Sequence, residues 1–233
     1  MFILTKPEEQ EQYKQLVPQV DEQLIEAVNE IILHASKTGS GPMNEHIHIA
    51  LTDHIAFAVK RHAQGLYIHN PFLFETKELY PEEYEMAEYA VETIKHRLGV
   101  DLGEKEAGFI ALHFHGALTN QHISEVRKYS ELVSDLVQTV EDKLEYNIPR
   151  DSLDYSRLIT HLRFALERIR RGEAVEETDS LDGLLKREYP EMYALAWKLT
   201  KIMEVRLKKT GLSGGSGIPY DSSPAAGPAE RTR

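Results

Sequence analysis

Apolar residues recur at intervals of three and four along most of the chain, which is the spacing of one face of an α-helix. The pattern predicts helices over 16–32, 47–65, 81–98, 104–113, 123–146, 151–172 and 190–202. Glycine and proline residues separate these segments, and Pro81 and Pro190 each stand where a helix begins. No run alternates between apolar and polar residues as a strand does. The sequence therefore predicts an all-α fold.

The remaining stretches lack this pattern. Residues 173–183 are acidic and read as a loop. Residues 211–233 contain 12 Gly, Pro and Ser among 23 residues, with no apolar period. Such a segment cannot bury enough surface to offset the entropy lost on ordering, so we expect a disordered tail.

An internal repeat organises the helices. Leu51–Arg61 reads LTDHIAFAVKR, and Leu158–Arg168 reads LITHLRFALER. Their histidines lie 107 residues apart, and the Tyr-Pro pairs at 80–81 and 189–190 lie 109 apart. Three matches in the same order predict a duplicated helical domain. The first copy continues into a helix that carries His113, whereas the second reaches the tail at that point, so the second copy reads as incomplete.

Composition narrows the possible functions. The 233 residues include 27 Lys and Arg against 38 Asp and Glu, a formal charge of −11. This balance disfavours a nucleic-acid backbone as ligand, because phosphate contacts need clustered basic residues. The absence of cysteine removes disulfides, cysteine nucleophiles and thiolate metal sites. No apolar run is long enough for a membrane span, and the N-terminus is unlike a signal peptide, so we expect a cytoplasmic protein without membrane contact.

Eleven histidines are many for this length. Most read as surface or core residues, but His54, His113 and His161 lie on otherwise apolar stretches, and two of them are repeat equivalents. A neutral imidazole can attack a phosphoryl group, so these three are candidate phosphoacceptors. A competing reading is a helical metal-dependent hydrolase. Its ligands would be His46, His48, Asp53 and His113.

Three further segments carry a resemblance to a known family. They are HNPFLFETKELYPEEYEMA, EKEAGFIALHFHGA and, from the second copy, LKREYPEMYALAW. Together with the repeated histidine segments, they resemble the PTS regulation domains (PRDs) of BglG/SacY-type transcription antiterminators. NEHIHIALTDHIAFA is most similar to the glucose-type branch. The resemblance covers about residues 1–209.

The resemblance implies compact helical bundles that pair into homodimers and are phosphorylated on histidine. It implies as partners HPr and a sugar permease B domain of the phosphotransferase system. The protein would then be a phosphorylation substrate and not an enzyme, with no cofactor or metal. His54 and His113 match the first-domain acceptors and His161 the first acceptor of the second domain, while His115 does not match. Asp53 would orient the His54 ring, and Arg61 and Arg168 would pair with phosphate or carboxylate.

The resemblance also predicts the domain organisation. Residues 1–13 would be a linker, 14–122 the first PRD and 123–210 a truncated second PRD. The family's N-terminal RNA-binding domain has no counterpart here, so RNA contact would require a domain that this chain lacks. We therefore expect the regulatory portion of a sugar-responsive antiterminator. A free-standing PRD interaction module without RNA output is the alternative within this family.

Overall fold

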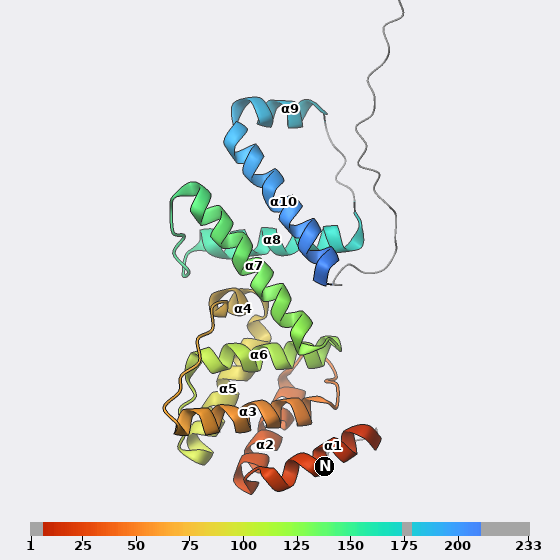
Figure 1. The fold of residues 1–233 in the computed structure, drawn as a ribbon, viewed down its shortest axis with the longest axis vertical. Coiled ribbons are helices and arrows are strands. Elements are labelled where there is room, and N and C mark those ends of the chain that lie inside the picture. Colours follow the sequence, from red (N-terminus) through yellow and green to blue (C-terminus); the bar gives the residue numbers. More distant parts are fainter. Residues whose placement is uncertain (1–6, 174–178, 211–233) are drawn as a thin grey trace, which may run out of the picture.

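The computed structural model describes residues 7–173 and 179–210, and every described element is helical (Figure 1). The predicted all-α fold is confirmed. The elements are α1 (Pro7–Leu16), a 3₁₀ turn (Val17–Gln19), α2 (Glu22–Thr38), α3 (Ile47–Ala63), α4 (Leu73–Leu79), α5 (Pro81–Leu98), α6 (Gly103–Thr119), α7 (Ile123–Leu144), α8 (Leu153–Arg171), α9 (Asp179–Glu188) and α10 (Pro190–Thr210).

Local chemistry fixes where these helices begin and end. The side chain of Asp21 accepts a hydrogen bond from the backbone N–H of Gln23 and so caps α2, and Ser152 caps α8 in the same way. The helices α5 and α8 stop at Gly99 and Gly172, which adopt the left-handed conformation with φ of 68° and 67°. These are the glycine stops that the sequence predicted.

The helices α2, α3, α5 and α6 of the first repeat form one bundle. The helix α5 packs along α6 and α2, while α3 packs against α2 and α6 (Figure 1). Their apolar faces enclose a core in which Ile31, Leu51, Ile94 and Ile110 are fully buried. The segment before this bundle also packs on it, because α1 lies against α3.

The helices α7, α8 and α10 of the second repeat share a second core. This core is completed by Phe72, Leu79, Tyr80 and Leu112 from the first repeat, because α4 packs against both α7 and α8. In Figure 1 the second repeat lies above the first, with α7 leading from one to the other. Side chains of the first repeat therefore contribute to both cores.

The internal repeat is visible in the element order. The series α2–α3–α4–α5 recurs as α7–α8–α9–α10, with His54 on α3 and His161 on α8. The helix α6 follows the first series, and no described helix takes the corresponding place on α8 and α10. Phe164, Trp197 and Val205 of the second repeat are accordingly 58%, 60% and 50% exposed.

Three sequence expectations need comment. The predicted loop over 173–183 is wrong for its last part, because α9 begins at Asp179, while residues 174–178 lie outside the described part of the chain. The expected linker 1–13 contributes residues 7–13 to α1. The expected disordered tail, 211–233, lies wholly outside the described residues.

Candidate functional site

Two helices of the first repeat place four polar side chains at their contact. His54 and Arg61 stand on α3, while Glu106 and His113 stand on α6. Each pair is seven residues apart, which is about two helical turns, so both members lie on the same face. Since α3 packs against α6, the two faces meet.

Glu106 is the centre of this cluster. Its Oε2 lies 3.0 Å from Nε2 of His54, and its Oε1 accepts a hydrogen bond from the Arg61 guanidinium. The Glu106 side chain is 4% exposed, against 18% for His54 and 15% for Arg61. A buried carboxylate requires compensation of this kind, because an unpaired charge in the interior is strongly destabilising.

His113 completes the cluster from the other side of His54. The two imidazole centroids are 4.7 Å apart, and the ring of Phe109 lies 6.4 Å from that of His54. The sequence predicted both histidines as acceptors without predicting contact between them. The structure places them side by side, so a charge on one ring acts directly on the other.

Burial keeps both rings neutral at pH 7. It lowers the pKa of His54 to about 4, with the Arg61 cation acting in the same direction and Asp53 opposing it. It lowers the pKa of His113 to about 3, with smaller contributions from His54 and His46. A neutral imidazole keeps a nitrogen lone pair, which a nucleophile requires.

The contact with Glu106 also sets the tautomer of His54. A carboxylate only accepts hydrogen bonds, so the proton of the neutral ring resides on Nε2. The lone pair is then on Nδ1. In catalytic sites, a carboxylate orients an imidazole through a hydrogen bond of the same kind.

One sequence expectation changes here. The hydrogen bond expected from Asp53 is made by Glu106 instead, because neighbouring residues on a helix point about 100° apart and Asp53 is exposed. Sequence reasoning missed Glu106, although it stands seven residues before His113 within the EKEAGFIALHFHGA segment.

His115 faces away from this cluster. Its Nδ1 lies 2.8 Å from Oε1 of Glu83, and its ring lies 4.0 Å from that of Tyr80. The spacing of two residues places it on the far side of α6 from His54. Its position agrees with its exclusion from the candidate acceptors.

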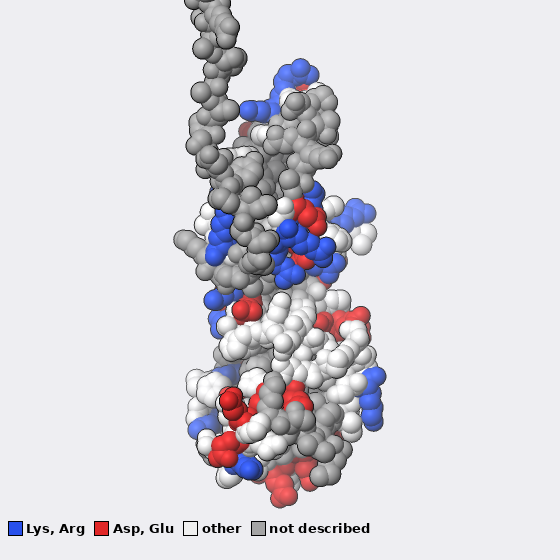
Figure 2. All heavy atoms as spheres, turned by 90° about the vertical axis from the view of Figure 1, so that its right-hand side faces the viewer, with Lys and Arg blue, Asp and Glu red and all other residues white. Residues whose placement is uncertain are grey.

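The second repeat has no comparable enclosure. His161 and Arg168 are exposed on α8, and no described helix supplies a counterpart of Glu106. Figure 2 shows basic side chains gathered at the height of the second repeat, above the more acidic lower end formed by the first. The helix α8 of the second repeat carries five arginines: Arg157, Arg163, Arg168, Arg170 and Arg171.

The residues proposed for a metal site do not converge. His48 is 6% exposed within the bundle, whereas Asp53, on the same helix, faces solvent. Among the described residues, no three His, Asp or Glu side chains come close enough to hold a metal ion. The described residues therefore offer no metal-binding site for the hydrolase interpretation.

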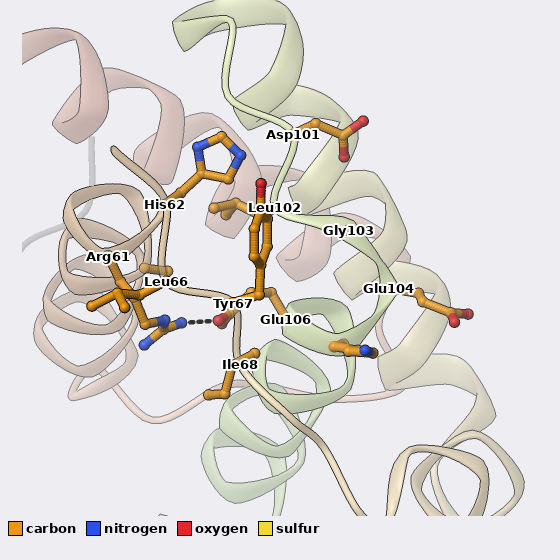
Figure 3. A pocket seen from close by; sticks show the side chains of 12 residues that line it. Arg61, His62, Leu66, Tyr67, Ile68, Asp101, Leu102, Gly103, Glu104 and Glu106 are labelled. Atoms are coloured by element: carbon orange, nitrogen blue, oxygen red, sulfur yellow. Dashed lines mark hydrogen bonds and ion pairs between the residues drawn. The ribbon is translucent and has the colours of Figure 1, made fainter. Parts of the chain in front are cut away.

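A cavity of about 290 Å³ opens beside the Arg61–Glu106 pair (Figure 3). In Figure 3, Tyr67 and His62 stand at its upper part, and the ion pair lies at its lower edge. Leu66 and Tyr67 are 57% and 81% exposed. Exposed apolar surface therefore lies beside the Arg61–Glu106 pair.

The profile of the PRD domain family matches residues 29–117 and 134–210. The two matches follow the two repeats and cover most of the chain. The chain belongs to the PRD family.

Similar proteins place it among PRD antiterminators. The PtsGHI operon antiterminator of Bacillus subtilis is 50% identical over 209 residues, which are 90% of this chain and 74% of that protein. Protein GlcT of Staphylococcus saprophyticus is 36% identical over 208 residues, 89% of this chain and 74% of that protein. These relatives are regulatory proteins and not enzymes.

A solved structure is similar to part of this chain. The crystal structure of GlcT CAT-PRDI superposes with a TM-score of 0.50 at 54% sequence identity, covering 52% of this chain and 71% of that one. The sequence resemblance to PRD antiterminators of the glucose-type branch is thereby confirmed. In the described part of this PRD chain, no helix is both long and apolar enough to cross a membrane.

Proposed function

We propose that this chain is the phosphorylation-controlled regulatory portion of a sugar-responsive antiterminator, with His54, His113 and His161 as acceptors. The observation that carries the proposal is the His54–Glu106–Arg61 cluster, with His113 against it. It holds two neutral imidazoles in fixed positions, one of them oriented by a carboxylate. Phosphotransferase-system proteins would supply the phosphoryl group, with HPr and a sugar permease B domain as the donors.

The chemistry of the cluster suits a reversible acceptor. In this arrangement Nδ1 of His54 carries the lone pair, so it is the attacking nitrogen, while Glu106 stabilises positive charge on the ring. The phosphoryl group then adds about −1.5 to −2 charges beside a buried carboxylate, by analogy with phosphoserine. That charge favours regrouping of Arg61 from Glu106 toward the phosphoryl group, because guanidinium binds phosphate well.

We further propose that this charge acts on a homodimer. Phe57 lies one turn beyond His54 on α3 and is 62% exposed, with the Arg61 guanidinium 5.2 Å from its ring centroid. A second copy covering this surface would bring two phosphorylated clusters near a twofold axis. Repulsion between them in a low dielectric would shift the balance between two dimer arrangements.

The direct test is incubation with phosphoenolpyruvate, enzyme I, HPr and a glucose permease B domain. We expect an acid-labile phosphoryl gain by intact mass, mapped by peptide analysis to His54 and His113. His54→Ala and His113→Ala should each remove their own site. A matched control is His96→Ala, an exposed histidine on α5 paired with Glu92. A folded wild-type chain that gains no phosphoryl group would refute the proposal.

The dimer is tested separately by sedimentation before and after phosphorylation. We expect the dissociation constant or the shape of the dimer to change in the wild type and to stay fixed in His54→Ala. A chain that sediments as a monomer at all concentrations, in both states, would overturn the dimer mechanism.

A further inference from the structure

A small cavity lies on the side of His113 away from the Glu106 cluster. Its volume is about 70 Å³, and its polar lining includes His46, His113, His122 and Asn44. His113 is half-buried, and its side chain lines this cavity. None of the cavity's other histidines is needed for the cluster around Glu106.

Two helices begin at this cavity. His46 immediately precedes α3, and His122 immediately precedes α7. The residues at both helix starts line the cavity together with His113, so the positive ends of two helix dipoles lie there. The lining therefore favours an anion.

Both loops are held in place against the end of α6. The backbone N–H of Asn44 donates to the carbonyl of Ala117, and the side-chain oxygen of Asn44 accepts from the N–H of His46 at 3.0 Å. On the other side, the N–H of Gln121 donates to the carbonyl of Gly116. The cavity is thus a built feature of the bundle.

The orientation of His122 is also defined. Its Nδ1 accepts a hydrogen bond from the backbone N–H of Ser124 at 3.2 Å, so a neutral His122 carries its proton on Nε2. That N–H is a donor available to a ligand. His46 supplies a second imidazole, close enough to influence the charge state of His113.

We propose that this cavity is the phosphoryl-binding pocket of His113, with His46 and His122 as the side chains that neutralise and hydrogen-bond the transferred group. The inference rests on the proposed function, since it takes His113 as an acceptor. In the transfer, a ring nitrogen of His113 bonds to phosphorus while the donor's bond to phosphorus breaks, and the donor atom keeps that electron pair. The proton on the other nitrogen of His113 passes to solvent, and the departing donor takes one up.

Substitutions of His46 and His122, which immediately precede α3 and α7, test the pocket. The replacement residues are chosen so that the N-terminal capping position of each helix stays favourable. Serine and aspartate are favourable residues immediately before a helix. His46→Asp and His122→Asp would place a carboxylate beside the phosphoryl group, and we expect each to slow phosphorylation of His113 by about tenfold. His46→Ser and His122→Ser, which are too short to reach the group, should cause smaller losses.

The readout is the rate of phosphoryl gain at His113 with phosphorylated HPr, mapped by mass spectrometry, with His54 measured in the same sample. Phosphorylation of His54 should change less than twofold, and His96→Asp should leave both rates unchanged. If wild-type His113 is phosphorylated and the aspartate variants match its rate, the pocket is refuted while the acceptor role stands. If no histidine of the wild type gains a phosphoryl group, the proposed function itself fails.

A second readout does not depend on rates. In the phosphorylated wild type, the side-chain ¹⁵N resonances of His46 and His122 should move toward the values of protonated imidazole, while His96 stays unchanged. Inorganic phosphate added to the unphosphorylated chain serves as the comparison. Movement of these resonances with inorganic phosphate, but not with phosphorylated His113, would overturn the assignment to a covalently bound group.

Discussion

His54 and His161 occupy equivalent positions in the two repeats, yet their surroundings differ in nearly every physical respect. His54 is enclosed between α3 and α6, bonded to a buried carboxylate and placed against a second histidine. His161 stands exposed on α8, without a counterpart of α6 among the described helices. The presence of α6 beside α3 therefore accounts for the different surroundings of His54 and His161, although the segments around both histidines are similar.

The difference teaches which element makes the site. The helix α3 supplies His54 and Arg61, and α8 supplies His161 and Arg168 in the same register. The helix α6 adds the carboxylate and the second histidine. The repeated segment alone thus does not determine the electrostatic environment of its histidine.

The largest effect should come from removing the arginine in each repeat. Arg61→Ala leaves the carboxylate of Glu106 buried without its cation, and we expect the free energy of unfolding to fall by about 3 kcal/mol. Arg168→Ala removes an exposed side chain, with an expected change within about 0.5 kcal/mol. Urea unfolding of the two variants measures both values. Equal decreases in the free energy of unfolding would contradict the difference in surroundings between Arg61 and Arg168.

A smaller change in the free energy of unfolding is expected when the pH is lowered. The pKa of folded His54, about 4, lies below the ordinary value of 6.5, so the unfolded chain takes up the proton first as pH falls. The stabilisation is complete above about pH 6.5 and is lost as the pH falls toward 4. We expect this loss to be on the order of 2 kcal/mol.

The substitutions that isolate this effect are His54→Gln and His161→Gln. Unfolding free energies measured between pH 4 and 7 should show a shallower pH dependence in His54→Gln than in the wild type. His161→Gln should follow the wild type, because His161 is exposed. A wild-type slope in both variants would contradict the enclosure of His54.

Two helical glycines extend the comparison to packing. A Cβ at Gly108 of α6 would lie 2.5 Å from Nδ2 of Asn70 and 2.8 Å from Cδ1 of Leu73, whereas nothing lies within 4 Å at Gly183 of α9. We expect Gly108→Ala to destabilise the chain by about 1–2 kcal/mol. Gly183→Ala should stabilise it by about 0.5 kcal/mol, since alanine favours a helix. Thermal unfolding would show opposite shifts, and stabilisation by Gly108→Ala would contradict the close packing of α6.

Much of this architecture could be predicted from sequence. The apolar period, the proline starts and the glycine stops gave the long helices, because these signals act within a few residues. The short helix α4 and the start of α9 escaped, since seven to ten residues carry too little periodicity.

The candidate site was predictable only in part. His54, His113 and His161 were predicted as candidates because each lies on an otherwise apolar stretch, and repetition supported the choice of His54 and His161. The pairing of His54 with Glu106 joins residues 52 apart in sequence, and nothing local indicates which carboxylate will be buried. The role predicted for Asp53 was wrong for another reason. Neighbouring residues on a helix direct their side chains apart.

The packing of α1 on α3 has a mechanical consequence. The ten residues of α1 extend about 15 Å and rest on the helix that carries His54. The two helices are in contact along this surface, so a displacement of α3 would be transmitted to α1.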